Sequence, residues 1–172
     1  MGEAKSSCEL FDITVEQKSL AIDEIQSQDP LVIAQRKALD AFHLIASPVV
    51  VNDAFWSIPS LNGFPGGYMK DICEWFTADD FITITRNKPD RRIILTECVV
   101  YKDSEIMKVF TKEFIGTISD STRGNGNSIE QVAMFNGMTL AEHSDLGQFS
   151  AKPEDLVWYD FAQWFSQHLA PK

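Results

Sequence analysis

The chain has 172 residues, of which 44% are hydrophobic and 23% are charged, and this length and composition predict a single globular domain over residues 1–172. The formal net charge of −10 repels phosphate backbones and anionic lipid, which argues against binding to nucleic acid or to a membrane surface. No run approaches the roughly 18 apolar residues of a membrane span, and no signal peptide is recognisable, so we expect a cytoplasmic protein.

The first predicted elements are a strand, a long helix and a second strand. Residues 9–15 alternate enough between apolar and polar side chains to predict a short strand. Asp29 and Pro30 are typical of an N-cap and a first helical position, and they predict a helix over residues 30–46. The β-branched run at residues 49–51 then predicts a short buried strand that ends at Asp53.

The rest of the chain predicts strands, loops and further helices. In chain order these are a Gly/Pro-rich loop at 62–68, a helix near 67–76, a small helix or turn through Asp79 and Asp80, a hairpin of strands 91–101 and 105–118, a strand at 131–135 and a helix over 153–169. This order indicates a mixed α/β fold rather than a doubly wound parallel sheet.

Carboxylates in loops and at strand ends are the first candidates for chemistry. Asp53 follows a buried strand, and Asp23 and Glu24 lie in the loop before the long helix. Two or three such carboxylates from separate loops are suited to Mg²⁺, which prefers oxygen ligands and commonly binds substrate phosphates as well. The alternative interpretation is that these acids cap helices or are simply solvated.

A possible anion site lies in the Gly/Pro-rich loop at residues 62–68. Its backbone amides precede a helix, a geometry that suits phosphate, and Lys37 and Lys70 lie on or beside the neighbouring helices. No GK[ST] sequence follows the loop, so it is not a P-loop. An ordinary surface loop with solvated lysines is the alternative.

The cysteines and the C-terminal aromatic residues have simpler explanations. Cys8, Cys73 and Cys98 are widely spaced and lack metal-ligand spacing, so we expect free thiols. The aromatic residues favour a hydrophobic core or a dimer interface over a base-stacking platform. They are Trp158, Tyr159, Phe161, Trp164 and Phe165.

Two long stretches carry a family resemblance. DEIQSQDPLVIAQRKALDA at 23–41 and SPVVVNDAFWSIPSLNGFPGGYMKDICEWF at 47–76 are similar, in order and spacing, to the inosine triphosphate pyrophosphatase family. That family carries a loop of the form LPE-x-Q, a helix ending K-A, a strand ending V-E-D-T or A-D-D-S, and a G-x-PG-x-Y loop. RGNGNSIEQVAMF and MTLAEHS, farther on, extend the resemblance.

The resemblance implies a fold, an activity and a cofactor. Members of this family have a mixed α/β fold, an elongated sheet with flanking helices in two lobes around a cleft, and they usually form homodimers. They use Mg²⁺ to hydrolyse nucleoside triphosphates of deaminated purines to a monophosphate and pyrophosphate. A nucleotide substrate, Mg²⁺ and a second copy of the chain are therefore the implied partners.

Individual residues take roles from the same resemblance. Glu24 and Asp53 match the acids on the metal side of the family's cleft, where a carboxylate orients or deprotonates the attacking water, and Lys37 matches the lysine that faces the phosphates. The loop that shapes the cleft and the dimer contact is matched by Gly63, Pro65, Gly66 and Tyr68.

The chain also departs from the family pattern. The family's first strand and T-x-N-x-x-K phosphate loop have no counterpart before residue 9, Asn52 stands where a first acid is expected, and Ala54 stands where Ser or Thr is usual. The base-reading segments are replaced by SIEQVAMF at 128–135 and VWYD at 157–160. These departures keep an alternative open: a catalytically impaired nucleotide-binding or protein-interaction scaffold on the same fold.

Overall fold

The protein is built on one elongated antiparallel sheet, seen in a computed structural model that describes residues 2–147 and 151–168. Its strands are β1 (Val49–Ile58), β2 (Phe64–Pro65), β3 (Arg92–Lys102), β4 (Met107–Ile118), β5 (Ala133–Phe135) and β6 (Met138–Thr139). They lie in the order β2-β1-β3-β4-β5-β6, and every neighbouring pair is antiparallel. The predicted mixed α/β class is confirmed.

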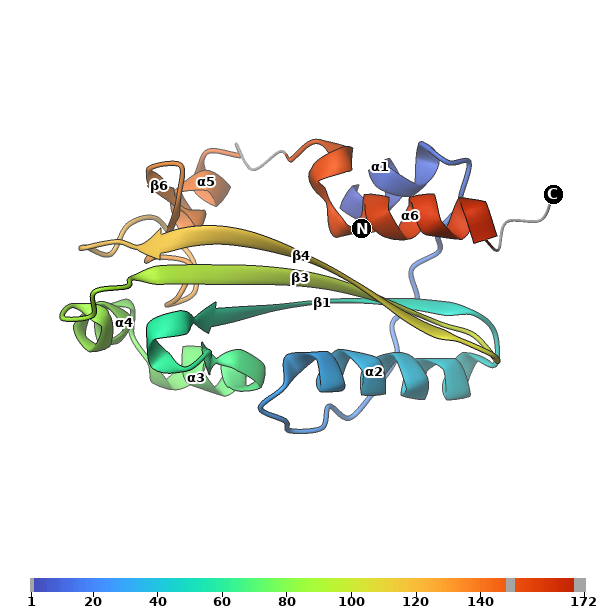
Figure 1. Cartoon of the computed structure of the whole chain (residues 1–172), viewed down its shortest axis with the longest axis horizontal. Helices are drawn as coiled ribbons and strands as arrows, with labels where there is room; N and C mark the ends of the chain where they lie inside the picture. The colour runs from blue at the N-terminus through green and yellow to red at the C-terminus, as the bar shows by residue number, and fades with distance from the viewer. Residues whose placement is uncertain (1, 148–150, 169–172) are drawn as a thin grey trace.

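Helices cover both faces of the sheet. They are α1 (Gly2–Glu9), α2 (Pro30–Ile45), α3 (Met69–Trp75), α4 (Ala78–Thr85), α5 (Leu140–Asp145) and α6 (Val157–His168), with short 3₁₀ turns at Pro59–Leu61, Gly66–Tyr68 and Pro153–Asp155. Figure 1 shows α2, α3 and α4 below the sheet, α1 and α6 side by side above one end, and α5 above the other end. We call the two faces of the sheet the α2 face and the α6 face.

Local signals explain the parts that the sequence predicted well. The side chain of Asp29 accepts a hydrogen bond from the Leu31 amide at 2.9 Å and caps α2, with Pro30 at its first position. The turn between β3 and β4 is closed by Asp103, whose Oδ1 accepts from the amides of Glu105 and Ile106 at 2.8 Å each. Both the helix and the hairpin are confirmed.

The α2 helix packs on the sheet through small residues. Ala34, Ala38 and Ala41 are its buried positions, whereas Val32 is 42% exposed. Because alanine lets a helix backbone come close to the strands, α2 can lie tightly over Cys98 of β3 and nearby residues. This close approach brings the polar side chains of α2 to the edge of β1.

Two sequence predictions about strands are wrong. Residues 9–15 form no strand: Glu9 ends α1, and the amides of Phe11 and Ile13 donate to the Cys8 carbonyl at 3.0 and 3.1 Å in a turn. The alternating burial of this segment is real, but it has no partner strand, and a strand needs one. Asp53 does not end its strand either, because pairing of β1 with β3 continues to Ser57.

The core is divided between the two ends of the sheet. One cluster surrounds Phe81 and Ile93 near α4, and another joins Val99 to Phe161 and Trp158 of α6, so the C-terminal aromatics are chiefly core residues, as one of the two predicted readings had it. The three cysteines are free thiols, as expected. Within residues 2–147 and 151–168, no helix combines the length and apolar character needed to cross a bilayer.

Candidate functional site

Three residues that the family resemblance selects converge at the edge of the α2 face. Glu24 comes from the extended segment before α2, Lys37 from the middle of α2, and Asp53 from the middle of β1. The Lys37 Nζ lies 2.5 Å from Glu24 Oε1 and 3.1 Å from Asp53 Oδ2. We call these three residues the Lys37 triad. Asp23, the other candidate in this loop, is exposed and has no place in the triad.

Opposite charges hold the triad together. The Lys37 side chain is only 23% exposed. Burial by itself lowers the pKa of Lys37, but the hydrogen bonds and charges of Glu24 and Asp53 outweigh burial, so its pKa is raised. The second Asp53 oxygen, Oδ1, accepts from the Ala54 amide at 3.0 Å, which fixes the carboxylate in place. The ammonium group is therefore fully charged at neutral pH, between two oriented carboxylates.

The donor chemistry of the triad fits a small divalent cation. Both carboxylates approach one positively charged nitrogen within 3.1 Å, so the position between them already accommodates a cation. Two carboxylates are the usual protein contribution to a Mg²⁺ site, whose other ligands are water and phosphate oxygens. In the described part of the chain, no group of three or more His, Cys, Asp or Glu side chains could hold a metal ion. A cation here would thus depend on its substrate for ligands.

The Gly/Pro-rich loop braces the segment that carries Glu24. The Gly67 amide donates to the Gln28 carbonyl at 3.4 Å, and a Cβ on Gly67 would lie only 2.0 Å from the Ser27 carbonyl oxygen. A Cβ on Gly66 would lie 3.1 Å from the Gln28 carbonyl oxygen. The loop therefore needs glycine for this close approach.

Other candidates on this loop stay apart from the triad. Tyr68 is 40% exposed, and Lys70 is an exposed residue of α3. Gly63 has a positive φ of 86° and open space around its Cα, and the Phe64–Pro65 peptide is cis. These residues shape the lobe that contains α3 without touching Glu24 or Asp53 through any hydrogen bond or ion pair in residues 2–147 and 151–168.

Asn52, which stands where the family pattern has its first acid, makes structural contacts in this chain. Neighbouring residues of a strand point to opposite faces, so Asn52 lies on the α6 face, away from the triad. Its amide donates to the Cys98 carbonyl at 3.0 Å and accepts from Trp158 Nε1 at 3.4 Å. The position that the resemblance gives to an acid is used here to join β1 to β3 and α6.

Sequence reasoning missed an acid on the same α6 face. Glu97 pairs with Ala54 on one side and with Lys112 on the other. Burial first, and then the charge of Glu3, raise the pKa of Glu97 to about 7 against the opposing effect of Lys112. The signal was available, because Glu97 interrupts the apolar series at alternate positions of β3, where Leu95 and Val99 are buried.

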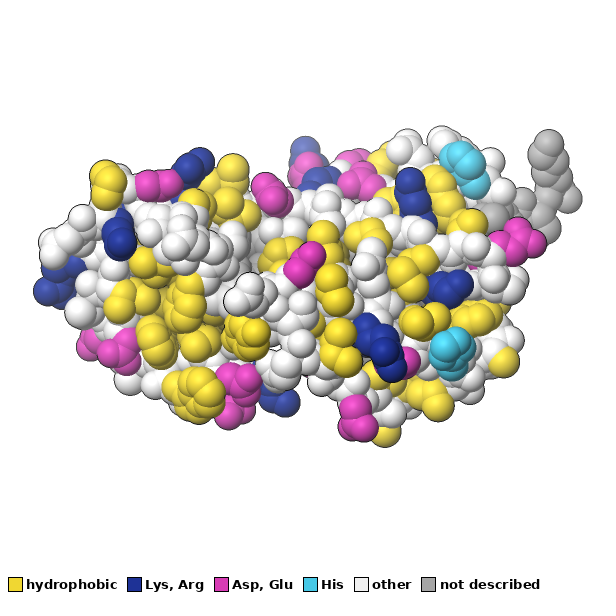
Figure 2. Space-filling view, turned by 60° about the horizontal axis from the view of Figure 1, so that its bottom comes forward, with side chains coloured by type: hydrophobic (Ala, Val, Ile, Leu, Met, Phe, Trp, Pro, Cys, Tyr) yellow, Lys and Arg dark blue, Asp and Glu magenta, His cyan; other side chains and the backbone are white. Residues whose placement is uncertain are grey.

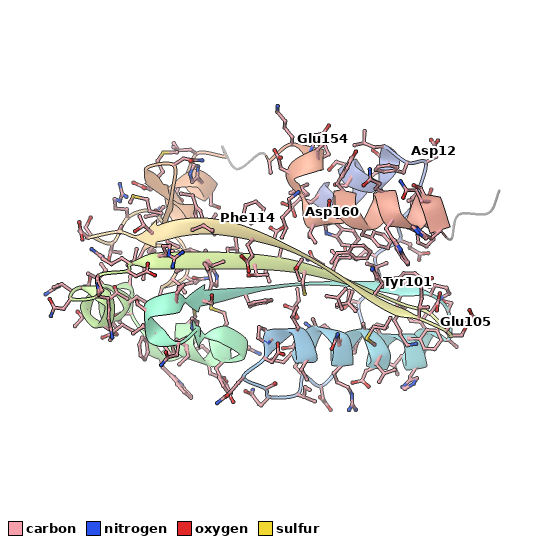
Figure 3. All side chains as sticks on the ribbon, in the orientation of Figure 1. Asp12, Tyr101, Glu105, Phe114, Glu154 and Asp160 are labelled. Atoms are coloured by element: carbon pink, nitrogen blue, oxygen red, sulfur yellow. The ribbon has the colours of Figure 1, made fainter. Side chains whose placement is uncertain are left out.

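A hollow of about 520 Å³ opens on the α6 face, and Glu97 is not among the residues that line it. Figure 3 shows Phe114, one of its lining residues, on β4, and Glu154 in the turn above the same face. The apolar part of the lining comes from Leu95, Phe114 and Phe135, and the polar part includes Lys112 and His143. Phe135 belongs to the segment 128–135 that replaces the family's base-reading residues, whereas the segment 157–160 does not line the hollow.

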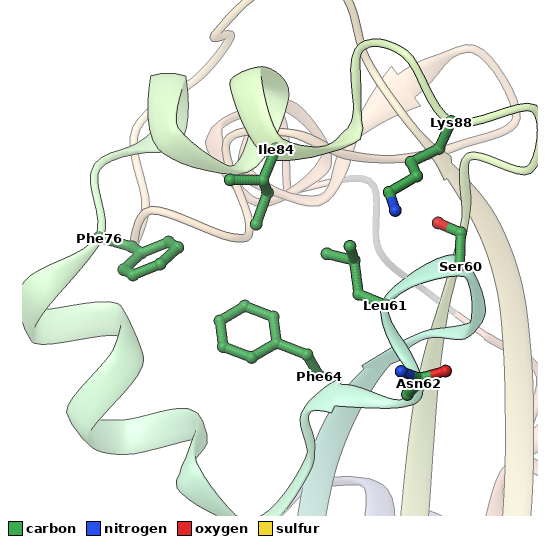
Figure 4. A pocket seen from close by; sticks show the side chains of 7 residues that line it. All are labelled: Ser60, Leu61, Asn62, Phe64, Phe76, Ile84 and Lys88. Carbon is green, nitrogen blue, oxygen red and sulfur yellow. The ribbon is translucent and has the colours of Figure 1, made fainter.

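A second, apolar groove of about 380 Å³ lies beside α3 and α4, which cover the α2 face at the same end of the sheet. Phe64, Phe76 and Ile84 form its floor, with Lys88 at the rim (Figure 4). Figure 2 shows hydrophobic side chains gathered on the surface of this lobe, which contains α3 and α4. Trp75, at the end of α3, is 73% exposed.

A family model and individual relatives of known name match this chain over most of its length. The family model described as the Ham1 family matches residues 2–144. Inosine triphosphate pyrophosphatase 2 of Trypanosoma cruzi (strain CL Brener) is 31% identical over 138 residues, covering 77% of this chain and 70% of the relative. A dITP/XTP pyrophosphatase of Methanopyrus kandleri is 26% identical over 172 residues, covering 98% and 92% of the two chains.

Solved structures share the fold. A HAM1 protein from Coxiella burnetii superposes with a TM-score of 0.72 at 15% identity, covering 93% of this chain and 84% of the other. The Staphylococcus aureus Ham1 protein gives a TM-score of 0.63 at 20% identity, covering 87% and 80%. The family match begins at residue 2, in α1, and ends at residue 144, before α6.

Proposed function

This chain belongs to the Ham1 family, the family of inosine triphosphate pyrophosphatases that the sequence motifs indicated, and on that premise we propose that it is a Mg²⁺-dependent nucleoside triphosphate pyrophosphatase. The proposed substrates are noncanonical nucleotides, such as those with deaminated purines, and the products are a monophosphate and pyrophosphate. The relatives' names, inosine triphosphate pyrophosphatase and dITP/XTP pyrophosphatase, support this class of substrate.

The observation that carries the proposal is the convergence of the Lys37 triad. Its members come from three separate segments of the chain, and nothing in the spacing of the sequence requires them to meet. Yet one ammonium nitrogen lies within 3.1 Å of both carboxylates. Burial of a charged group is unfavourable unless the group is paired, and such an arrangement is typical of a functional site.

In the proposed reaction Glu24 and Asp53 would hold Mg²⁺, and their carboxylates would orient the attacking water. Bound Mg²⁺ would neutralise charge on the phosphate oxygens. Lys37, released from its two carboxylates, would then bind a phosphate oxygen, since its Nζ is placed between them by α2. Hydrolysis breaks the bond between the α-phosphorus and its bridging oxygen, and pyrophosphate leaves with that oxygen.

The Gly/Pro-rich loop has a supporting role in this proposal. Gly63, Pro65, Gly66 and Tyr68 would position substrate indirectly, because the loop packs on the Ser27–Gln28 backbone three to four residues after Glu24. A shift of that backbone would move the Glu24 carboxylate relative to Lys37.

We also propose that the protein acts as a homodimer through the lobe of α3 and α4. Trp75 and Ile84 are 73% and 36% exposed on this lobe, beside the apolar groove, and large exposed apolar patches commonly mark protein interfaces. Light scattering should give the mass of two chains for the wild type and of one chain for Trp75→Glu. A monomeric wild type would contradict this part of the proposal.

A second candidate function is a scaffold of the same fold that binds nucleotide or another protein without hydrolysing it. Two observations favour it. Lys37 already pairs with both carboxylates of the triad, and Asn52 is engaged in structural hydrogen bonds with Cys98 and Trp158 rather than offering an acid.

The two functions are separated by measuring pyrophosphate release with Mg²⁺ from ITP, XTP, dUTP and the common nucleoside triphosphates. An enzyme should act on at least one of them and lose that activity in Asp53→Asn, which keeps the shape of the side chain. Absence of pyrophosphate from every nucleotide would leave the scaffold.

A further inference from the structure

The lobe of α3 and α4 carries an exposed aromatic ring next to an apolar groove. Trp75 is the last residue of α3 and is 73% exposed, and the residue after it, Phe76, lines the groove. Trp75 itself is not among the lining residues, so its own indole ring leaves the groove open. One lobe therefore presents both a projecting ring and a groove of about 380 Å³ whose lining is mostly apolar.

We propose that the groove of each copy receives the Trp75 ring of a second copy, so that the contact is made twice about a two-fold axis. In a two-fold dimer the same patch meets itself, so that a ring on one copy meets the groove of its partner, and the partner's ring meets the first groove. This inference rests on the homodimer proposed above and names the contact that forms it. It does not depend on the pyrophosphatase activity.

The groove is suited to an aromatic occupant. Figure 4 shows Phe64, Phe76 and Ile84 around its open space. The rings of Phe64 and Phe76 already contact each other, with centroids 5.5 Å apart and a tilt of 46°. A further ring placed against them would gain from aromatic contact as well as from burial.

The area that two such rings bury is appropriate for a stable dimer. A buried tryptophan contributes about 150–250 Å². Two of them, with the groove surface that they cover, supply a large part of the roughly 1,600 Å² that a standard interface buries. Buried tryptophan side chains are also the residues on which binding energy most often concentrates.

The charges beside the ring and at the groove are opposite in sign. Glu74, next to the ring, and Lys88, at the groove, are both exposed, and neither takes part in an ion pair within residues 2–147 and 151–168. Two acids at the start of α4 differ in this respect: Asp79 accepts a hydrogen bond from Thr122 at 3.1 Å, and Asp80 caps the helix.

This charge pattern favours a second copy as the occupant. Two chains that each carry a net charge of −10 repel each other, so a contact between them is favoured where an acid meets a base. Seating the Trp75 ring in the groove would bring Glu74 toward the partner subunit's Lys88. The symmetric contact would do the same in the opposite direction.

The first test measures the dimer Kd by light scattering over a dilution series of the wild type, Trp75→Ala and Leu44→Ala. Leu44 is a matched control, because it is 62% exposed but lies at the end of α2, outside the lobe. We expect the Kd of Trp75→Ala to rise about 100-fold or more, because both copies lose their anchor. Leu44→Ala should match the wild type, and circular dichroism should show that both variants are folded.

Mixing two variants tests whether the ring enters the groove. Trp75→Ala keeps the groove and lacks the ring, whereas Ile84→Glu keeps the ring and places a charge in the groove. Alone, each variant loses both contacts, but a mixed dimer keeps one. The mixture should therefore contain dimers at a concentration at which each variant alone is monomeric, and a mixture that stays monomeric would overturn the proposal.

Reversing the charges tests the proposed ion pair. Glu74→Lys and Lys88→Glu should each raise the Kd about tenfold, because like charges then face each other across the contact. The double variant should return to within about threefold of the wild type, since the two effects are coupled. Purely additive losses in the double variant would overturn the pairing of Glu74 with the partner's Lys88.

The outcomes separate this inference from the proposals on which the chain's function depends. A wild-type dimer whose Kd is unchanged by Trp75→Ala would overturn this inference alone. A monomeric wild type would overturn the proposed homodimer and this inference together. Assemblies larger than two chains would contradict the two-fold axis, because a ring and a groove that meet without one link chains in an open series. Pyrophosphate release is measured separately and tests the proposed activity.

Discussion

Replacing Lys37 with methionine tests the electrostatic account of the triad. Methionine keeps most of the buried stem and removes the charge, which leaves the carboxylates of Glu24 and Asp53 close together without a partner. The side chains of Glu24 and Asp53 are 50% and 30% exposed. Loss of the two ion pairs of Lys37 should therefore lower the free energy of unfolding more than loss of a surface pair does and less than loss of a buried pair does.

The expected magnitude follows from that intermediate exposure. Exposed pairs contribute about 0.2–1 kcal/mol, and breaking a buried pair costs about 3–5 kcal/mol, so we expect the free energy of unfolding of Lys37→Met to fall by about 1–2 kcal/mol. Urea titration followed by circular dichroism, without divalent cations, measures this difference. Lys70→Met, on an exposed position of α3, is the matched control and should stay within about 0.5 kcal/mol of the wild type.

Magnesium makes the same experiment specific for the proposed site. In Lys37→Met a cation has no ammonium group to displace, so Mg²⁺ at about 100 times its Kd should raise the free energy of unfolding by about 2.7 kcal/mol. The wild type should gain less. The reasoning is refuted if Lys37→Met is as stable as Lys70→Met. It is also refuted if Mg²⁺ does not stabilise Lys37→Met more than it stabilises Lys70→Met, which keeps the intact triad.

Three further changes have defined outcomes. Gly67→Ala should lower the free energy of unfolding by about 1–3 kcal/mol in urea titration, because its Cβ would lie 2.0 Å from the Ser27 carbonyl oxygen; an unchanged midpoint would show that the loop does not pack there. Asn52→Ala should cost about 1–2 kcal/mol in thermal unfolding, since Trp158 Nε1 loses its acceptor; a melting temperature equal to the wild type would contradict this. Burial raises the pKa of Glu97 from 4.5 to about 7, so wild-type stability should fall as pH rises through that interval, and Glu97→Gln should abolish the fall; a slope retained in the variant would assign it to another group.

The sequence predicted best those elements whose signals are local. Asp29 and Pro30 specify the start of α2 through one side-chain hydrogen bond and one fixed φ angle, and the Asp103 turn joins two strands that are neighbours in the chain. Such features depend on residues a few positions apart, and pattern reading detects them.

The predictions that failed depend on distant partners. Alternation at residues 9–15 is compatible with a strand, but only a neighbouring strand could make it one. The length of β1 is set by its pairing with β3, a segment some 45 positions later, as Asp53 opposite Cys98 illustrates. Neither the missing partner of residues 9–15 nor the pairing of β1 with β3 can be detected from a local pattern. The prediction therefore ended β1 too early, at Asp53.

The candidate site shows the same division. Resemblance selected Glu24, Lys37 and Asp53, whereas spacing alone left them open to a capping or solvated role, and only the packing of α2 on β1 brings them together. The raised pKa of Glu97 comes first from burial and then from the charge of Glu3 in α1, and both depend on how distant parts of the chain pack.

The most direct test of the central claim is product analysis after incubation of ITP and Mg²⁺ with the wild-type chain and with Asp53→Asn. The account predicts equal amounts of IMP and pyrophosphate from the wild type and neither product from Asp53→Asn. Equal turnover by the two proteins, or release of inorganic phosphate with IDP in place of pyrophosphate, would contradict it.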